Sequence, residues 1–281
     1  MALAAIIALA GLGLAPGRAG VPALAQGNAQ GPSGAAASAA PEPRLEAIRA
    51  RGLLRACIWP DYFAISYRNP RNGQLEGIDI DMAEAFARRL SVRLGFVETN
   101  FAEFLDRLER GDCDVAMFAV GITPPRQQRA AFSAPYLASP VYAVTTRDNA
   151  RVRRWEDIDR PGRVVAVAAG TLMEPLMRSE LKEAELLVVR PPATREAEVQ
   201  AGRADVFMSD YPYTRRMVLM HDWARIIDPP GRFGETRYAY AVAKDDPAWL
   251  AEVDAFVAAA KADGTLARAA EKHGLTPILV R

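Results

Sequence analysis

Cysteine and histidine are scarce in this sequence of 281 residues, which contains only Cys57, Cys113, His221 and His273. The histidines stand alone and no cysteine has a partner at metal-ligand spacing, so the sequence predicts no metal site and no cofactor. Two cysteines can pair in an oxidising compartment. We expect these two at opposite ends of neighbouring strands, however, and therefore predict that both are buried and unpaired.

The sequence also lacks an excess of charge of one sign. Lys and Arg number 35 and Asp and Glu number 34, which leaves a formal net charge of +1. This balance gives no basic field to attract phosphates, so we expect no nucleic-acid partner. Hydrophobic residues make up 50% of the chain, and a globular chain of this length can form two lobes with separate cores.

Long apolar runs are confined to the N-terminus. Leu3 to Leu14 consists almost wholly of small and aliphatic residues, and Ala23-Leu24-Ala25 fits a signal-peptidase cleavage site. The pattern predicts a secretory signal peptide over 1–25 and a periplasmic protein. Residues 26–43 are rich in Ala, Gly, Pro, Ser and Gln, which predicts a flexible spacer. No later run is long enough to span a bilayer.

Apolar segments of strand length alternate with helical patterns through the rest of the chain. Strands are expected at 53–58 and 92–97, and a helix with an apolar face separates them. Asp79 and Asp81 lie at the start of that helix, where we expect them to cap it and complement its dipole. This alternation predicts an α/β fold with mostly parallel sheets.

One strand is followed by a turn and a helix that favour an anion. The apolar strand at 115–120 ends at Gly121, Pro124 and Pro125 open the next helix, and Arg126 lies in its first turn. Free backbone N–H groups at a helix start and the fork of an arginine both suit a carboxylate. A solvated surface arginine is the alternative explanation.

Several motifs in this order resemble one family. They are the turn from Ile122 to Gln128 (Ile-Thr-x-x-Arg-Gln-Gln), Phe-Ser-x-Pro-Tyr at 132–136, and Gly202-Arg203-Ala204-Asp205 followed by Asp210. The chain from 44 to 275 is similar to the solute-binding proteins of polar amino-acid ABC importers, bacterial extracellular family 3. The resemblance implies a two-lobed Venus flytrap fold. Each lobe would be a mostly parallel sheet flanked by helices, and two crossover strands would join 44–138 and 233–281 to 139–232.

The resemblance also implies a ligand site. Arg126 would hold the α-carboxylate of an amino acid, helped by Thr171 and by the backbone N–H of Leu172, which replaces a threonine of the family. Asp210 would hold the α-ammonium, although a helix N-cap is the ordinary role of such a residue. The full set of expected ligand-binding residues is Trp59, Tyr62, Phe101, Phe118, Gly121, Arg126, Thr171, Leu172 and Asp210.

The expected pocket departs from the family pattern. Phe118 stands where relatives carry a small polar residue, and Gly121 stands in place of a serine. Together with Trp59, Tyr62 and Phe101 these residues predict an apolar, aromatic pocket, which disfavours a basic or strongly polar ligand.

Binding without chemistry is the function that the resemblance predicts. We expect a monomer that captures an amino acid or similar carboxylate, delivers it to an ABC permease and is not an enzyme. The alternative is a cyclohexadienyl (arogenate/prephenate) dehydratase, an enzyme class that resembles the same fold. In those enzymes a glutamate soon after the Gly-Thr turn is the general acid. Glu174 lies one residue further from the turn than that pattern requires. A receptor input domain is a third class, and the lack of a following transmembrane segment disfavours it.

Overall fold

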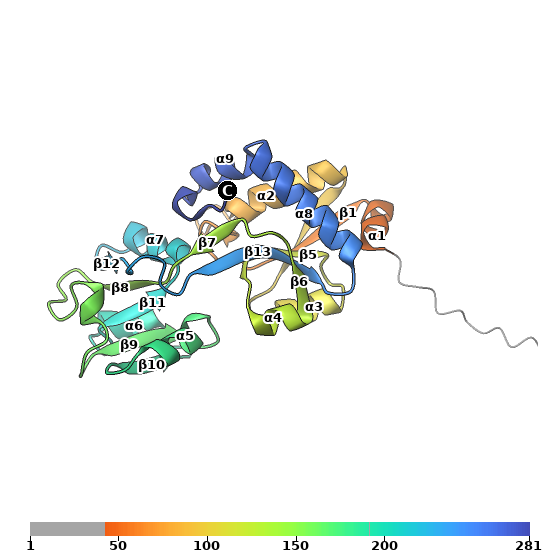
Figure 1. Ribbon diagram of the computed structural model, residues 1–281. Helices are drawn as coiled ribbons and strands as arrows, with labels where there is room; N and C mark the ends of the chain where they lie inside the picture. Colours follow the sequence, from red (N-terminus) through yellow and green to blue (C-terminus); the bar gives the residue numbers. More distant parts are fainter. Residues whose placement is uncertain (1–42, 191) are drawn as a thin grey trace, which may run out of the picture. The chain divides into compact units, whose positions relative to one another are not determined.

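Two mixed β-sheets organise the chain in the computed structural model, which describes residues 43–190 and 192–281 (Figure 1). The expected signal peptide and the spacer up to residue 42 lie outside the described residues. Each sheet combines parallel strands with antiparallel strands added at one side. No helix of the described ranges is both long and apolar enough to cross a membrane.

The first sheet has the strand order β4-β1-β5-β13-β6, and β7 also pairs with β13. β1 pairs in parallel with β4 and β5, whereas β13 runs antiparallel to β5, β6 and β7. Its strands are β1 (Leu53–Ile58), β4 (Arg93–Glu98), β5 (Val115–Gly121), β6 (Ala130–Phe132), β7 (Leu137–Ser139) and β13 (Thr236–Ala243).

Helices cover both faces of the first sheet. In Figure 1, α2, α8 and α9 lie over one face, and α3 and α4 lie on the other. The helices are α1 (Arg44–Arg51), α2 (Ile78–Leu90), α3 (Phe104–Glu109), α4 (Pro124–Arg129), α8 (Pro247–Ala262) and α9 (Thr265–Lys272), with a 3₁₀ turn, η2 (Thr276–Ile278), near the end. A small antiparallel hairpin pairs β2 (Tyr67–Arg68) with β3 (Leu75–Glu76).

The second sheet has the strand order β10-β9-β11-β8-β12. The chain enters it after β7 and returns to the first sheet through β13. Its elements are β8 (Tyr142–Thr146), β9 (Val164–Ala168), β10 (Glu185–Val189), β11 (Val206–Ser209), β12 (Ala224–Ile227), η1 (Trp155–Asp157), α5 (Met173–Glu180), α6 (Arg195–Gln200) and α7 (Tyr211–Met220).

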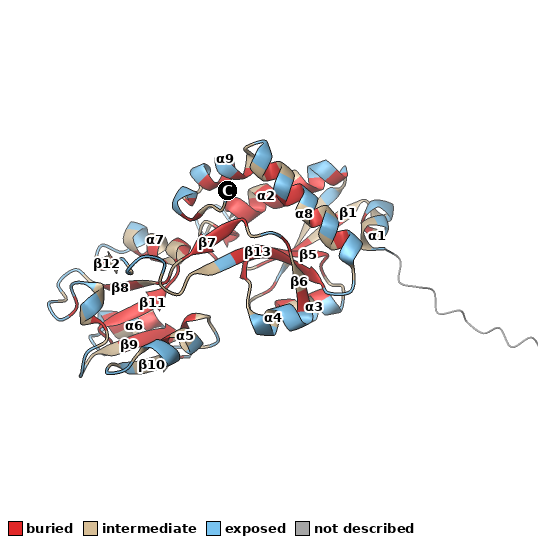
Figure 2. Ribbon diagram, viewed as in Figure 1, coloured by how far each residue is buried: buried red, intermediate tan, exposed pale blue. Residues whose placement is uncertain are grey.

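Side-chain alternation divides the core of the second sheet between two faces. Val165 and Val167 of β9 pack with Met173 and Met177 of α5, and Ala166, between them, faces the opposite cluster with α6 and α7. Successive residues of a strand point to opposite faces, so a strand covered on both sides must be apolar throughout. Figure 2 shows the strands of both sheets largely buried and the helices buried on one side only.

The prediction of unpaired cysteines is wrong. Cys57 and Cys113 form a disulfide with a Cα–Cα distance of 5.6 Å. The register between the two strands explains it: Cys57 pairs with Ala116, so the end of β1 lies beside the beginning of β5 and next to Cys113. The order of the strands in the sequence does not reveal how β1 and β5 are offset relative to each other.

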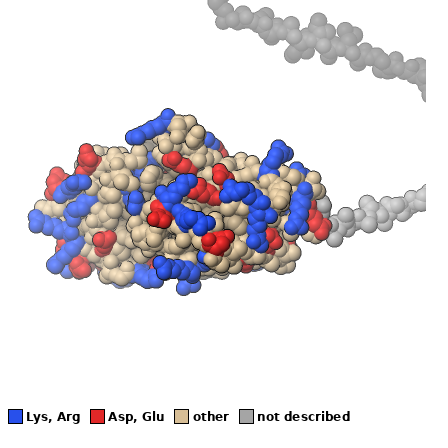
Figure 3. Space-filling model, turned by 90° about the horizontal axis from the view of Figure 1, so that it is seen from above, with Lys and Arg blue, Asp and Glu red and all other residues tan. Residues whose placement is uncertain are grey.

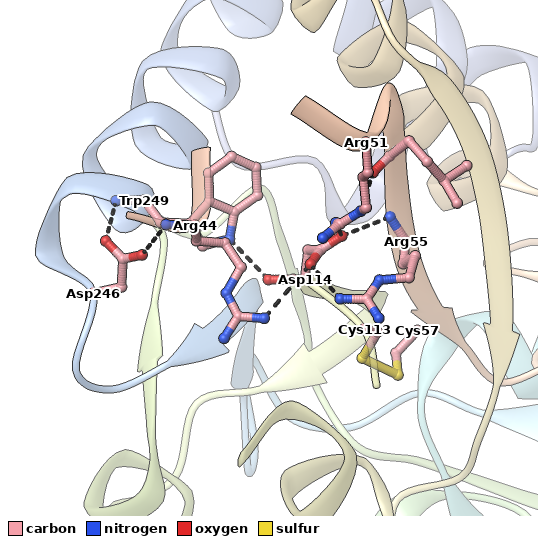
Figure 4. Close-up of polar contacts among 9 residues, drawn as sticks. Arg44, Arg51, Arg55, Cys57, Cys113, Asp114, Asp246 and Trp249 are labelled. Carbon is pink, nitrogen blue, oxygen red and sulfur yellow. Dashed lines mark hydrogen bonds and ion pairs between the residues drawn. A yellow bond between two sulfur atoms is a disulfide. The ribbon is translucent and has the colours of Figure 1, made fainter. Parts of the chain in front are cut away.

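A buried carboxylate anchors the same region (Figure 4). Asp114 is fully buried, and its carboxylate faces Arg44 at 3.5 Å, Arg55 at 3.0 Å and also Arg51. Its backbone oxygen accepts a hydrogen bond of 2.8 Å from Trp249 Nε1 of α8. These contacts join α1, β1 and α8 around the start of β5. At the surface, charges of both signs are interspersed (Figure 3), in line with the balanced composition.

Candidate functional site

A pocket of about 350 Å³ is lined by residues of both sheets. The first sheet and its loops contribute Trp59, Tyr62, Gly121 and Tyr238, among others, and the second sheet contributes the turn after β9 and the start of α7. The carboxyl ends of β5, β9 and β11 lead into these segments, which is where open α/β sheets place ligands. Pockets of this volume take small molecules.

Arg126 lines the pocket from the first turn of α4. Its Nη1 donates a 3.0 Å hydrogen bond to the carbonyl of Gly121, and its guanidinium carbon lies 5.1 Å from the Phe101 ring centre. Burial lowers the pKa of the Arg126 guanidinium, which means that its charge is partly desolvated. No acidic side chain of the described chain pairs with it, so a ligand carboxylate would satisfy its remaining donors.

Aromatic rings form the wall beside Arg126. The ring of Trp59 lies 5.4 Å from that of Tyr62 and 5.3 Å from that of Phe101, and all three residues line the pocket. Phe118 lies behind them, fully buried, with its ring 5.1 Å from that of Phe101. It therefore supports the wall and is not among the residues that line the cavity, where the sequence placed it.

Gly121 and Leu172 meet across the pocket, although they belong to different sheets. A Cβ atom on Gly121 would lie 2.8 Å from Leu172 Cδ1 and 2.9 Å from Thr236 Cγ2. The two departures from the family pattern, glycine for serine and leucine for threonine, are therefore neighbours. The larger leucine occupies the space that a side chain at position 121 would fill.

Asp210 joins the two sheets. Its side chain caps α7 by accepting a 3.3 Å hydrogen bond from Tyr213 N, and its Oδ2 accepts hydrogen bonds from the hydroxyls of Tyr62 and, at 3.2 Å, Tyr238. The N-cap and the pocket roles thus coincide in one residue. Burial raises the pKa of the Asp210 carboxyl, opposed by these hydrogen bonds and by the charge of Arg195.

The turn after β9 contributes Thr171 and Leu172 to the pocket but not Glu174. The carboxylate of Glu174 accepts hydrogen bonds of 3.0 Å from Gly170 N and from Arg178 Nη2. Both donors lower the pKa of Glu174. Glu174 is therefore an ionised residue that caps the start of α5, and it lacks the position and protonation state of a general acid.

Eight of the nine expected ligand-binding residues line the pocket, Phe118 being the exception. Sequence reasoning missed several others, including Ala119, Arg195, Arg216 and Tyr238. Arg195 is buried and paired, because its Nε lies 3.0 Å from Glu196 and its Nη1 donates to the carbonyl of Met208 at 2.9 Å. No sequence motif marked these residues, since their role depends on which loops meet.

The expectation that Asp79 and Asp81 cap α2 is wrong. The N-cap is Gly77, without a side-chain hydrogen bond. Asp79 points into the core and accepts hydrogen bonds from the hydroxyls of Tyr136 and Tyr240. Asp81 instead pairs with Lys272 and His273 of the closing helix region, both at 2.9 Å. Over residues 43–190 and 192–281, no group of three or more His, Cys, Asp and Glu side chains could hold a metal ion.

Comparison with known proteins identifies relatives over most of the chain. The sequence model of the bacterial extracellular solute-binding proteins, family 3, matches residues 54–276. The L-cystine-binding protein TcyJ of Escherichia coli is 25% identical over 235 residues, 84% of this chain and 87% of that protein. The crystal structure of the ancestral amino-acid-binding protein AncCDT-1, a precursor of cyclohexadienyl dehydratase, is similar with a TM-score of 0.72 and 32% identity. The match covers 81% of this chain and 98% of the AncCDT-1 chain.

A further relative corrects the prediction that the chain is not an enzyme. The cyclohexadienyl dehydratase of Pseudomonas aeruginosa is 32% identical over 228 residues, 81% of this chain and 84% of that protein. This similarity to an enzyme points to enzymatic activity. The two-lobed α/β architecture expected from the sequence is confirmed by the sheets and by the solved relatives.

Proposed function

Because the chain belongs to the bacterial extracellular solute-binding proteins of family 3, we propose that it binds a small ring-bearing carboxylate outside the cytoplasm and dehydrates it. The substrate class is that of the cyclohexadienyl dehydratases, prephenate or arogenate. One observation carries the proposal: the buried carboxyl of Asp210 lines the same apolar pocket as the unpaired guanidinium of Arg126.

The pocket provides for each part of such a substrate. Arg126 would take the side-chain carboxylate through charge-assisted hydrogen bonds, each worth about 1.5–3 kcal/mol. The rings of Trp59, Tyr62 and Phe101 would cover the apolar ring of the substrate. A raised pKa keeps a carboxyl protonated at higher pH, so Asp210 is the residue suited to donate a proton here.

The reaction of prephenate then balances as follows. The bond between ring carbon 1 and its carboxylate breaks and carbon dioxide leaves, so that its electron pair enters the ring. The bond between ring carbon 4 and its hydroxyl breaks, and the hydroxyl takes a proton from Asp210 and leaves as water. The product is phenylpyruvate, and solvent returns a proton to Asp210. A positioned general acid contributes about 10²–10⁴-fold to such a step.

Prephenate turnover by the mature chain from residue 26 tests this proposal. We expect phenylpyruvate to form, with a large loss of kcat in Asp210→Asn and little change in Glu174→Gln, because Glu174 lies outside the pocket. The melting temperature of each variant checks that it folds. Absence both of phenylpyruvate from prephenate and of phenylalanine from arogenate would contradict dehydration, and loss of turnover in Glu174→Gln alone would assign the acid to that residue.

Delivery of an amino acid to an ABC permease is a second candidate, supported by the guanidinium of Arg126 and the carboxyl of Asp210 in one pocket. A zwitterion could place its carboxylate at Arg126 and its ammonium at Asp210. Ligand binding to the folded state raises the melting temperature by mass action. We expect a thermal shift with one of the common amino acids that both Arg126→Ala and Asp210→Ala abolish. A panel without any shift would leave this role unsupported.

A further inference from the structure

We propose that Arg216 is a second anion-binding residue of the pocket, which makes the ligand a dicarboxylate. The inference rests on the proposed function in one respect only, that a ligand carboxylate binds at Arg126. It adds a specificity-determining residue on α7, Arg216, and assigns the second carboxylate of the ligand to it.

Two tyrosine rings hold the Arg216 guanidinium at the pocket. Its carbon lies 5.4 Å from the ring centre of Tyr67 in β2 and 5.9 Å from that of Tyr213 in α7. The two rings come from the β2-β3 hairpin and from α7, and Arg216 and Tyr213 both line the pocket. A guanidinium stacked on aromatic faces keeps its in-plane N–H groups free for an acceptor. Arg216 is thus positioned without using its hydrogen-bond donors.

The donors of Arg216 have no partner within the described chain. Arg216 forms no hydrogen bond or ion pair with residues 43–190 or 192–281. Asp61 is an exposed acidic residue that also lines the pocket, and it pairs with neither Arg216 nor Arg126. Arg195 provides the contrast, because Glu196 neutralises it at 3.0 Å. The pocket therefore presents two guanidinium groups, those of Arg126 and Arg216, whose charge is balanced by no carboxylate among the described residues.

A ligand with one carboxylate would satisfy only one of these groups. A ligand with two carboxylates and an apolar ring could pair with both groups and place its ring against the aromatic residues that also line the pocket. Prephenate and arogenate each carry two carboxylates, whereas most common amino acids carry one. The charges of the pocket therefore favour the dehydratase substrate class over a neutral amino acid.

Binding of two matched probes tests the role of Arg216. Phenylsuccinate and 3-phenylpropanoate differ by one carboxylate, and isothermal titration gives Kd for each. We expect the wild type to bind phenylsuccinate more tightly. In Arg216→Gln we expect phenylsuccinate to bind about ten-fold or more weakly and 3-phenylpropanoate to change less than about two-fold, since one charge-assisted contact is lost.

Arg215→Gln is the matched control. It removes the same charge from the same helix, but Arg215 does not line the pocket. The guanidinium of Arg215 packs against Gly274 instead, where a Cβ atom would lie 2.7 Å from Nη2. We expect this variant to bind both probes as the wild type does. Equal weakening of both probes in Arg216→Gln would overturn the proposal and leave Arg216 a structural bridge to Tyr67. No weakening would overturn it as well.

Different binding and turnover results would exclude the anion site at Arg216 and the dehydration of prephenate. A wild type that binds phenylsuccinate no more tightly than 3-phenylpropanoate, or binds neither, overturns the dicarboxylate site even if prephenate is dehydrated. Arg126→Gln should weaken both probes, because both carry the carboxylate assigned to Arg126. If that variant binds both normally while Arg216→Gln loses phenylsuccinate, the anion site at Arg216 stands and the assignment of Arg126 fails.

Discussion

The backbone N–H of Ala119 donates a 2.8 Å hydrogen bond to Oδ2 of Asp79, which reaches it from the first turn of α2. Ala119 lines the pocket and has a φ of +49°, in the left-handed region that non-glycine residues rarely adopt. At the same place the register between β5 and β13 shifts. The buried carboxylate of Asp79 therefore holds an unfavourable backbone conformation at the floor of the pocket.

Asp79 makes the stability of the fold depend on pH. Burial raises the pKa of its carboxyl from 3.8 to about 7, despite the hydrogen bonds from Tyr136, Ala119 and Tyr240. A carboxyl with a raised pKa in the folded state stabilises the fold fully below pH 3.8, and this contribution is lost as the pH rises towards 7. The loss amounts to about 4 kcal/mol.

Asp79→Asn should remove this slope. We expect the free energy of unfolding of the variant, measured in urea at pH 5 and pH 7, to change less between the two pH values than that of the wild type. Tyr136 and Tyr240, the other titratable groups that face Asp79, have pKa values raised by burial and stay neutral in this window. Glu84→Gln, on the exposed side of the same helix and paired only with Arg88, should keep the wild-type slope. Equal slopes in Asp79→Asn and wild type would contradict the argument.

Gly121 and Leu172 should be energetically coupled. Gly121→Ser alone would push against Leu172 Cδ1, and Leu172→Thr alone would leave space unfilled. Overpacking of this kind costs about 1–3 kcal/mol. In the double variant the smaller threonine makes room for the serine, so the combined loss should be smaller than the sum by about 0.5 kcal/mol or more. Urea unfolding of the four proteins measures the coupling, and additive losses would refute it.

The disulfide between Cys57 and Cys113 should stabilise the folded chain. The two residues are 56 positions apart, and closing a loop of that order contributes about 2–4 kcal/mol, mainly by restricting the unfolded chain. We expect the Cys57→Ser/Cys113→Ser double variant to lose this amount and to become insensitive to reductant. A wild-type urea midpoint that does not change on reduction would show that the cross-link contributes nothing.

Asp114 should be far more sensitive to substitution than a surface carboxylate. Asp114→Asn leaves Arg44, Arg51 and Arg55 without their shared buried partner, which should cost about 3 kcal/mol or more. Glu98→Gln breaks an exposed pair with Arg68 and should cost less than about 1 kcal/mol. Chemical unfolding of both variants makes the comparison, and similar losses would contradict the difference in burial.

Local sequence patterns predict the secondary-structure elements and part of the site. Continuous apolar strands, glycine turns and proline-initiated helices are local patterns, so the α/β architecture and the turn carrying Arg126 could be predicted from them. Asp210 and Thr171 were predicted from the resemblance to the family, and both line the pocket, beyond the carboxyl ends of β11 and β9.

Which side chains meet depends on how the elements pack in three dimensions. Whether Cys57 lies beside Cys113 depends on strand register, and whether Phe118 or Arg216 lines the pocket depends on how distant loops pack. Asp79 at a helix start is locally indistinguishable from a cap, and only the tyrosines at 136 and 240, brought in by other segments, turn it into a buried hydrogen-bond acceptor. These contacts join residues that are remote in sequence, so local sequence patterns do not reveal them.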